Sequence, residues 1–300
     1  MSGLIKGNYV KREGKGVSHG KIILMGEHSV VYGYPAIAIP LRDILAECSI
    51  MKSKERFIHK KYDPLSTAIY AALKYLGKEG ENIKYSVTSH IPTKRGMGSS
   101  AAVSIAAIRG VFDYFKKKIE EDILVSLVNE AEIIAHSNPS GLDARTCLSN
   151  KAIKFIKNKG FENIELNLGA ELLIGDTGIH GNTGEAVEKI RMMGKKAQPM
   201  LEKLGSLTEE TEIYIRNRDI LNIGKNMIRA NEELEKLGVT VKKSEILVKA
   251  ALTAGALGAK MSGGGLGGCI IALAENKEKC EKVKMKLIKE GATHIWQTAL

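Results

Sequence analysis

The pattern of apolar and polar positions predicts short strands that alternate with amphipathic helices. Apolar runs bounded by glycine, proline or polar residues predict strands at 21–25, 36–41, 45–51, 83–88, 151–157, 172–175, 269–273 and 293–297. Apolar residues that recur with helical spacing predict helices at 64–76, 99–115, 120–136, 184–204, 209–237, 242–257 and 277–289. Gly205 and Gly238 are expected to break the helical pattern. This order is typical of an α+β or mixed α/β protein.

Length and composition narrow the class of protein. Three hundred residues suffice for two domains, and we expect residues 1–168 and 169–300, with the boundary near Gly169. An apolar fraction of 44% and a charged fraction of 26% are typical of a globular protein. We expect a cytoplasmic protein without membrane contact, because no apolar run is long enough to span a bilayer and residues 1–12 lack the apolar segment of a signal peptide.

The cysteines and the charge exclude some classes of function. The four cysteines form no C-x-x-C pair, so we expect small buried apolar side chains rather than a zinc or redox site. The net charge of +11 would suit a nucleic-acid partner. However, lysines alternate with glutamates, as at 278–282, and five Phe and one Trp offer little surface for base stacking. We therefore expect attraction for anionic small molecules and no nucleic-acid partner.

A glycine and serine run at 96–102 leads directly into a helix of small residues. Glycine allows the backbone to approach a ligand closely, and the first helical turn presents free N–H groups and the positive end of the helix dipole. The run lacks both the lysine of a P-loop and the third glycine of G-x-G-x-x-G. Two interpretations stay open: a phosphate cradle, or a helix whose N-cap is Ser99 or Ser100.

Polar residues follow several apolar segments. Lys21 opens a strand that ends in a turn with Glu27 and His28, which are suited to binding a hydroxylated or carboxylate substrate or are surface groups of the turn. Asp143 follows the turn 138–142 and is either an N-cap or a carboxylate directed at a substrate hydroxyl. Glu132 is either a metal ligand or a solvated helix residue.

Two further loops carry glycine. The segment 176–183 contains hydroxyls and glycines that suit a substrate loop or a simple turn. The segment 262–268 holds five glycines between two apolar segments. We expect its backbone to pass close to bound phosphates and to the run at 96–102.

Three segments together resemble the GHMP kinase superfamily, and within it the mevalonate kinases. They are 21–36, which contains Gly-Glu-His-Ser-Val-Val-Tyr-Gly, 92–102, which contains Gly-Met-Gly-Ser-Ser-Ala-Ala, and 260–269, which contains Lys-Met-Ser-Gly-Gly-Gly. The turn 138–143, Asn-Pro-Ser-Gly-Leu-Asp, is also similar. Ser29 and Met97 depart from common family residues, and 93–95 is Thr-Lys-Arg where relatives often carry smaller residues.

The resemblance implies a fold and an activity. The fold is of the α+β class, a two-domain GHMP kinase fold whose N-terminal domain is like ribosomal protein S5 domain 2 and whose C-terminal domain is ferredoxin-like. The activity is transfer of the ATP γ-phosphoryl group to the 5-hydroxyl of mevalonate. ATP and mevalonate are then the small-molecule partners. A homodimer stays open, because the sequence does not give the oligomeric state.

The resemblance also assigns roles to residues. Asp143 accepts the hydroxyl proton, and Lys21 stabilises the developing charge. Lys21, Glu27, His28 and Thr183 bind the acceptor, while Ser100 and Glu132 hold Mg²⁺ as the cofactor. The ATP-binding loop consists of Pro92, Thr93, Lys94, Arg95, Gly96, Met97, Gly98, Ser99, Ser100, Ala101 and Ala102.

Three alternatives remain for the function. The first is a related kinase for phosphomevalonate, homoserine or a sugar. The second is a catalytically silent nucleotide-binding regulator. The third is a basic nucleic-acid-binding protein, which would bind nucleic acid with a steep dependence on salt.

Overall fold

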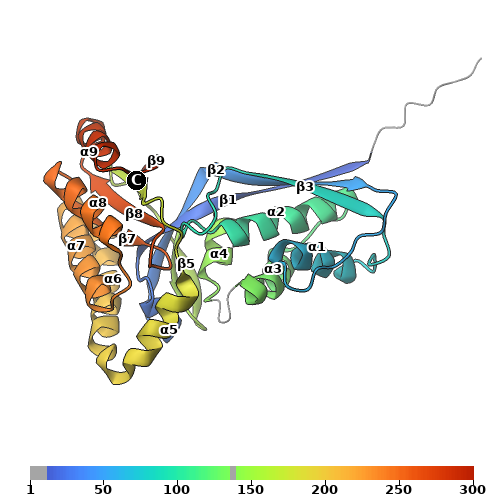
Figure 1. Ribbon diagram of the computed structural model, residues 1–300, viewed down its shortest axis with the longest axis horizontal. Coiled ribbons are helices and arrows are strands. Elements are labelled where there is room, and N and C mark those ends of the chain that lie inside the picture. Colours follow the sequence, from blue (N-terminus) through green and yellow to red (C-terminus); the bar gives the residue numbers. More distant parts are fainter. Residues whose placement is uncertain (1–11, 136–139) are drawn as a thin grey trace, which may run out of the picture.

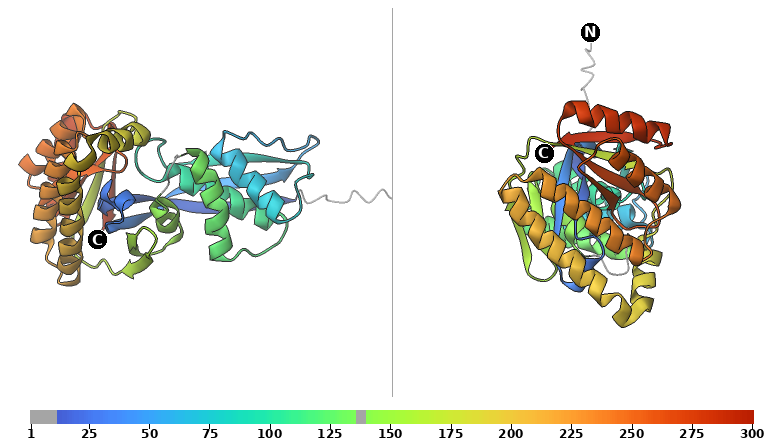
Figure 2. Two further views of the ribbon diagram at one scale, coloured as in Figure 1. Left: turned by 90° about the horizontal axis from the view of Figure 1, so that it is seen from below. Right: turned by 90° about the vertical axis from the view of Figure 1, so that its left-hand side faces the viewer.

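The computed structural model describes residues 12–135 and 140–300, which form an elongated molecule with two units placed end to end (Figures 1 and 2). The first unit is built on a five-stranded antiparallel sheet in which β1, β2, β4 and β5 are neighbours in that order and β3 pairs with β2. Its strands are β1 (Glu13–Met25), β2 (Ala36–Lys52), β3 (Ile83–Ser89), β4 (Ala152–Ile156) and β5 (Gly160–Ile164).

The helices of the first unit pack together beside its sheet (Figure 1). They are α1 (Pro64–Tyr75), α2 (Ser99–Tyr114), α3 (Glu121–Ala135) and α4 (Leu142–Leu148). Glycine allows β1 and α2 to approach closely, because a Cβ at Gly16 would lie only 2.0 Å from the carbonyl oxygen of Ala106. This contact holds the middle of α2 against the first part of β1.

The second unit contains a four-stranded antiparallel sheet in the order β7, β8, β6, β9. Its strands are β6 (Glu171–Asp176), β7 (Gly258–Ser262), β8 (Cys269–Ala274) and β9 (Ile295–Ala299). Its helices are α5 (Thr183–Met193), α6 (Gln198–Arg216), α7 (Ile220–Lys236), α8 (Lys242–Thr253) and α9 (Lys277–Lys289). With α5 to α8 grouped between β6 and β7, the connectivity is β-α-β-β-α-β, which matches the expected ferredoxin-like topology.

One hydrophobic core extends through both units. It includes Ile22 and Ile37 from the first sheet and Leu172, Leu204 and Met261 from the second unit. Helix α6 also packs against β1, β2 and the short 3-10 helix η1 (Ser29–Tyr32). This shared core fixes the two sheets relative to each other and so fixes the walls of the space between them.

Of the strands predicted for the first unit, 83–88 and 151–157 agree with β3 and β4 to within one residue at each end, whereas others were too short, divided or missing. Strand β1 begins at Glu13 rather than at 21, because its glycine-rich start carries little apolar side chain to detect. The two strands predicted at 36–41 and 45–51 are one strand, with a register shift opposite His19 and Gly20. Strand β5 was not predicted, since its first four residues are exposed.

The predicted helix break at Gly205 is wrong. Gly205 lies inside α6, where a Cβ would lie 2.5 Å from the ring of Tyr34, so this glycine makes room for an aromatic side chain. The helical segments are instead interrupted at the 3-10 helix η2 (Gly194–Lys196) and at 217–219. Position 136 of the helix predicted at 120–136, and Asn138 and Pro139 of the predicted turn, lie outside the described residues.

Two other expectations concern burial and membranes. All four cysteines are buried, as expected, and burial raises the pKa of the Cys48 thiol to about 12. Within 12–135 and 140–300, no helix combines the length and the apolar character that crossing a bilayer requires.

Candidate active site

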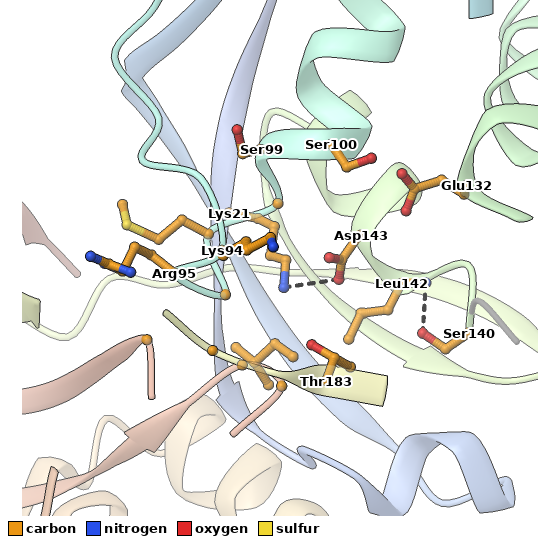
Figure 3. A pocket seen from close by; sticks show the side chains of 18 of the residues that line it. Lys21, Lys94, Arg95, Ser99, Ser100, Glu132, Ser140, Leu142, Asp143 and Thr183 are labelled. Atoms are coloured by element: carbon orange, nitrogen blue, oxygen red, sulfur yellow. Dashed lines mark hydrogen bonds and ion pairs between the residues drawn. The ribbon is translucent and has the colours of Figure 1, made fainter. Parts of the chain in front are cut away.

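A cleft of about 820 Å³ lies between the two units, where β1, the N-termini of α2 and α4, and the 262–268 loop meet (Figure 3). Segments far apart in the sequence line it. The lining includes most of the residues that the sequence singled out, namely Lys21, His28, Thr93, Lys94, Arg95, Gly96, Met97, Gly98, Ser99, Ser100, Glu132, Asp143 and Thr183. The exceptions are Glu27, Pro92, Ala101 and Ala102.

Lys21 and Asp143 form an ion pair in this cleft. Lys21 Nζ lies 2.8 Å from Asp143 Oδ1; the Lys21 side chain is 2% exposed and that of Asp143 is 33% exposed. The Lys21 backbone N–H donates to the carbonyl of Met97 at 3.0 Å. This hydrogen bond ties β1 to the first glycine loop, residues 92–98, which leads into α2. The N-cap of α4 is Gly141, so the alternative that Asp143 is the cap is wrong. One oxygen of the Asp143 carboxylate therefore contacts a buried cation while the side chain stays partly open to the cleft.

The glycine loop adopts a conformation that few residue types tolerate. Lys94, Gly96 and Gly98 have φ values of 56°, 76° and 73°. Gly98 is the N-cap of α2 and makes no side-chain cap, so the alternative of a Ser99 or Ser100 cap is wrong. A Cβ at Gly98 would lie 2.8 Å from Lys21 Cγ, which explains why glycine is needed there. The first-turn N–H groups of α2 are therefore available to an anion at the cleft.

Ser100 and Glu132 lie on the same side of the cleft (Figure 3). Ser99 Oγ donates to the carbonyl of Ile91 at 3.3 Å, whereas buried Ser100 Oγ has no hydrogen-bond partner within the part of the chain that the structure describes. Glu132 is only 4% exposed, so the alternative of a solvated helix residue is wrong. A hydroxyl and a carboxylate are hard oxygen donors that fit Mg²⁺.

The donor set around Ser100 is small. Among residues 12–135 and 140–300, no group of three or more His, Cys, Asp or Glu is placed to hold a metal ion. Mg²⁺ commonly binds through one or two protein oxygens together with substrate phosphates and waters. The pair therefore suits a metal that arrives with a nucleotide rather than a resident structural ion.

Glu27 and His28 are buried rather than displayed on a surface turn. Glu27 makes a fully buried ion pair with Lys260 of β7 and does not line the cleft. His28 lines the cleft, and its Nε2 has no hydrogen-bond partner among the described residues. Burial, and secondarily the charge of Lys260, lowers the pKa of His28 to about 4, so the ring is neutral at pH 7.

The 262–268 loop packs against the first glycine loop, as expected. A Cβ at Gly263 would lie 2.6 Å from the Cα of Gly96, and one at Gly268 would lie 3.1 Å from the carbonyl oxygen of Arg95. Gly264 lies against Thr183, which starts α5 across the cleft from Ser100 (Figure 3). Glycine at 263 and 268 thus allows the backbones of the two loops to lie in direct contact.

Some predicted residues shape the loop without lining the cleft. Ala101 and Ala102 are buried in the first turn of α2, and Pro92 precedes the loop. Sequence reasoning missed the roles of Lys260 and Asp176, which hold Glu27 and Arg95. The only signal for Lys260 was a lysine within an apolar segment directly before a glycine cluster.

Comparisons with known proteins identify similar chains. The GHMP kinases N terminal domain matches residues 65–151, and the GHMP kinases C terminal domain matches residues 211–293. Mevalonate kinase of Pyrococcus furiosus is 33% identical over 86% of this chain and 88% of its own length. Mevalonate kinase of Methanocaldococcus jannaschii is 28% identical over 90% of this chain and 94% of its own length.

Solved structures have the same architecture. The crystal structure of Methanococcus jannaschii mevalonate kinase superposes with a TM-score of 0.82 at 25% identity, covering 98% of this chain and 99% of that one. The L. major mevalonate kinase in complex with R-mevalonate has a TM-score of 0.83 at 24% identity, covering 96% of each chain, and supports the fold alone. The expected two-domain α+β architecture is confirmed.

Proposed function

The chain belongs to the GHMP kinase family, and on that premise we propose that it transfers the γ-phosphoryl group of ATP to the 5-hydroxyl of mevalonate, forming 5-phosphomevalonate and ADP. The observation that carries this proposal is the Lys21–Asp143 ion pair at the N-terminus of α2. The pair places the Asp143 carboxylate where it can contact an alcohol and the Lys21 ammonium where it can contact a phosphoryl group. Both lie beside the N-terminus of α2, whose free N–H groups can bind an anion.

Asp143 and Lys21 supply the chemistry of the acceptor side. Phosphoryl transfer requires in-line positioning and neutralisation of charge on the phosphoryl oxygens. The Asp143 carboxylate orients the hydroxyl and accepts its proton as the oxygen attacks phosphorus. The Lys21 ammonium lowers the pKa of that hydroxyl and stabilises the charge on the transferred group.

The glycine loop binds the nucleotide. Backbone N–H groups between Gly96 and Ala102 hold the α- and β-phosphates at the N-terminus of α2. Ser100 and Glu132 would hold Mg²⁺, which would neutralise negative charge on the nucleotide phosphates. The side chains of these two residues support this assignment because both face the cleft as oxygen donors.

The acceptor binds between His28 and Thr183. Neutral His28 suits a hydrogen bond with a hydroxyl better than charge pairing with a carboxylate. Apolar Val30, Val31 and Val187 also line the cleft, and they favour an acceptor with a methyl group over a sugar with hydroxyls all round. Glu27 acts behind this wall, through its ion pair with Lys260.

Further proposals concern organisation. We assign residues 1–168 and 169–300 to the two domains, since β5 ends at Ile164 and β6 begins at Glu171. A cytoplasmic location and a homodimer are also proposed. Light scattering of the purified protein tests the dimer, and cell fractionation tests the location.

ADP release from Mg-ATP tests the function directly. We expect release only with mevalonate in a panel that also contains phosphomevalonate, homoserine and galactose. A preference for another alcohol in the panel would support the kinase activity but would assign a different acceptor substrate to the protein. Release that is equal with and without every acceptor would contradict the proposal.

A further inference from the structure

The side chain of Arg95 does not follow the backbone of its loop into the cleft. Its guanidinium points away from Asp143 (Figure 3). Arg95 Nε lies 2.7 Å from Asp176 Oδ1, with 11% and 9% of the two side chains exposed. The contact is an ion pair between the first glycine loop and the second sheet, and it is shielded from water.

Asp176 is a fixed anchor for this contact. It ends β6, its backbone N–H donates to the carbonyl of His294 at 2.9 Å, and its carbonyl accepts from Thr293 at 3.0 Å. Its Oδ1 atom also accepts the N–H of Gly178 at 2.8 Å. Because both its backbone and its side chain are held, Asp176 has a fixed position relative to the second sheet. It therefore fixes the position of Arg95 relative to that sheet.

The loop around Arg95 is held from two directions. On the side of the first sheet, the carbonyl of Met97 accepts from Lys21. On the side of the second unit, the carbonyl of Lys94 accepts from Gly181 at 2.8 Å, and Gly268 packs on the backbone of Arg95. The Arg95–Asp176 pair is the charged member of this second set of contacts.

Stability alone does not account for such a pair. Removing two charges from water costs about as much as their attraction returns, so a buried ion pair adds little net stability. What it does fix is geometry, because each charge must stay beside its partner. Asp176 neutralises the charge of Arg95, although the buried Nε and Nη1 atoms of the guanidinium have no hydrogen-bond partner among the described residues. Because the guanidinium is buried and points away from Asp143, it is not placed to bind phosphate itself (Figure 3).

We propose that Arg95 and Asp176 are a positioning pair that sets the affinity for the nucleotide phosphates without touching them. By fixing the loop to the second sheet, the pair aligns the backbone N–H groups that receive the phosphates. The inference rests on the proposed function, in which this loop binds ATP.

A second buried ion pair offers a matched comparison. Glu27 and Lys260 also join the first unit to the second, and both side chains are fully buried. They lie behind His28, on the acceptor side of the cleft, because Glu27 adjoins His28 in the chain and the Lys260 charge acts on the His28 ring. Disturbing this pair should affect acceptor binding rather than nucleotide binding.

The test measures Mg-ADP affinity by calorimetry and the two KM values by ADP release, for Arg95→Met, Asp176→Asn and the double variant. Each single variant should raise the Kd of Mg-ADP and the KM of ATP about tenfold, with the KM of mevalonate changed less than about twofold. The double variant should show about the same tenfold loss rather than a hundredfold one, since both changes break one contact. It also leaves no unpaired buried charge, which keeps the folded protein available if a single variant is unstable.

The comparison variants separate positioning from general damage. The double variant Glu27→Gln with Lys260→Met should show the opposite pattern, a raised KM for mevalonate and an unchanged Kd for Mg-ADP. Arg191→Met, which removes an exposed arginine paired with Glu188, should change neither. An unchanged Kd of Mg-ADP in Arg95→Met would overturn the inference. Equal losses of affinity for ATP and for mevalonate in the Arg95, Asp176 and Glu27/Lys260 variants would also overturn it. Absence of Mg-ADP binding in the unaltered protein would instead contradict the proposed function.

Discussion

Glycine at the helix N-caps leaves the polar side chains of the site available for chemistry. Gly98 and Gly141 occupy the N-cap positions of α2 and α4 with positive φ. A serine or aspartate cap would use its side-chain oxygen to accept the N–H groups of its own helix. The sequence alone left capping open for Ser100 and Asp143, although a glycine stood directly before each helix. The deciding fact is backbone conformation, which residue identity only suggests.

The site residues divide by how well their roles could be predicted. Lys21, Asp143, Ser100 and Glu132 were selected through the family resemblance, and the structure brings them to one cleft. Glu27 was expected in the acceptor site but lies behind its wall, because its partner Lys260 is more than two hundred residues away in the chain. A partner at that separation leaves no local pattern in the sequence.

Removing the Asp143 carboxylate should abolish efficient transfer. In Asp143→Ala, kcat should fall by at least about 10²-fold because the acceptor hydroxyl loses its proton acceptor. The Kd for Mg-ADP should stay nearly unchanged, since the carboxylate faces the alcohol. Asp122→Ala, an exposed aspartate of α3, is the control. Near-normal turnover would remove Asp143 from its assigned role.

Glu132→Gln should raise the Mg²⁺ concentration required for half-maximal activity several-fold, because an amide oxygen is a weaker ligand for a hard cation than a carboxylate. The measurement is a titration of activity with Mg²⁺ at fixed ATP. Glu130→Gln, an exposed neighbour on the same helix, should behave like the unaltered protein. Identical titrations for both variants would assign Glu132 a structural role.

His28 should make the protein less stable in acid. Its pKa falls from 6.5 when unfolded to about 4 when folded, so the unfolded chain binds more protons between these values and stability drops as the pH falls through this range. Between pH 7 and pH 5 the loss from this one group is about 2 kcal/mol. Chemical denaturation at both pH values measures it, and His28→Gln should show a smaller drop by that amount. Equal drops would mean that His28 is not buried in its neutral form.

At the scale of elements, close packing hides some secondary structure from sequence patterns. The start of β1 carries Gly14 and Gly16 where a strand would usually carry large side chains, because α2 lies directly against its backbone. Gly205 led to the opposite error, a predicted helix break where the helix continues. This glycine lies inside α6 and leaves room for the ring of Tyr34. Long amphipathic segments such as α1 and α9 were predicted to within one residue at each end. Hydrophobic periodicity predicts which side chains are buried. It does not show which neighbouring group packs against a glycine.

The β1–α2 contact predicts a sharp difference between two glycines. Gly16→Ala places a methyl group about 2 Å from the carbonyl of Ala106, so it should lower the free energy of unfolding by about 3 kcal/mol or more. Gly80→Ala is the control, because a Cβ there meets nothing within 4 Å. Urea denaturation compares them. A Gly16→Ala protein as stable as the control would show that β1 and α2 are not in this contact.

At the scale of the whole molecule, function depends on segments brought together by two sheets. The cleft draws on β1, the 93–100 loop, α3, α4, the start of α5 and the 262–268 loop. The pattern of elements left the class of fold open between α+β and mixed α/β, and it did not predict this convergence, which is a long-range property of the topology. The family resemblance supplied it, and the contact between the two glycine loops agrees with it.

The identity of the product decides whether this protein phosphorylates the 5-hydroxyl of mevalonate. The purified protein is incubated with Mg-ATP and R-mevalonate, and phosphorus NMR of the mixture is recorded. We expect one ADP for each new phosphomonoester, with phosphorus coupled to the methylene protons of carbon 5. Free inorganic phosphate with unchanged mevalonate, or a phosphoryl group on another oxygen, would contradict it.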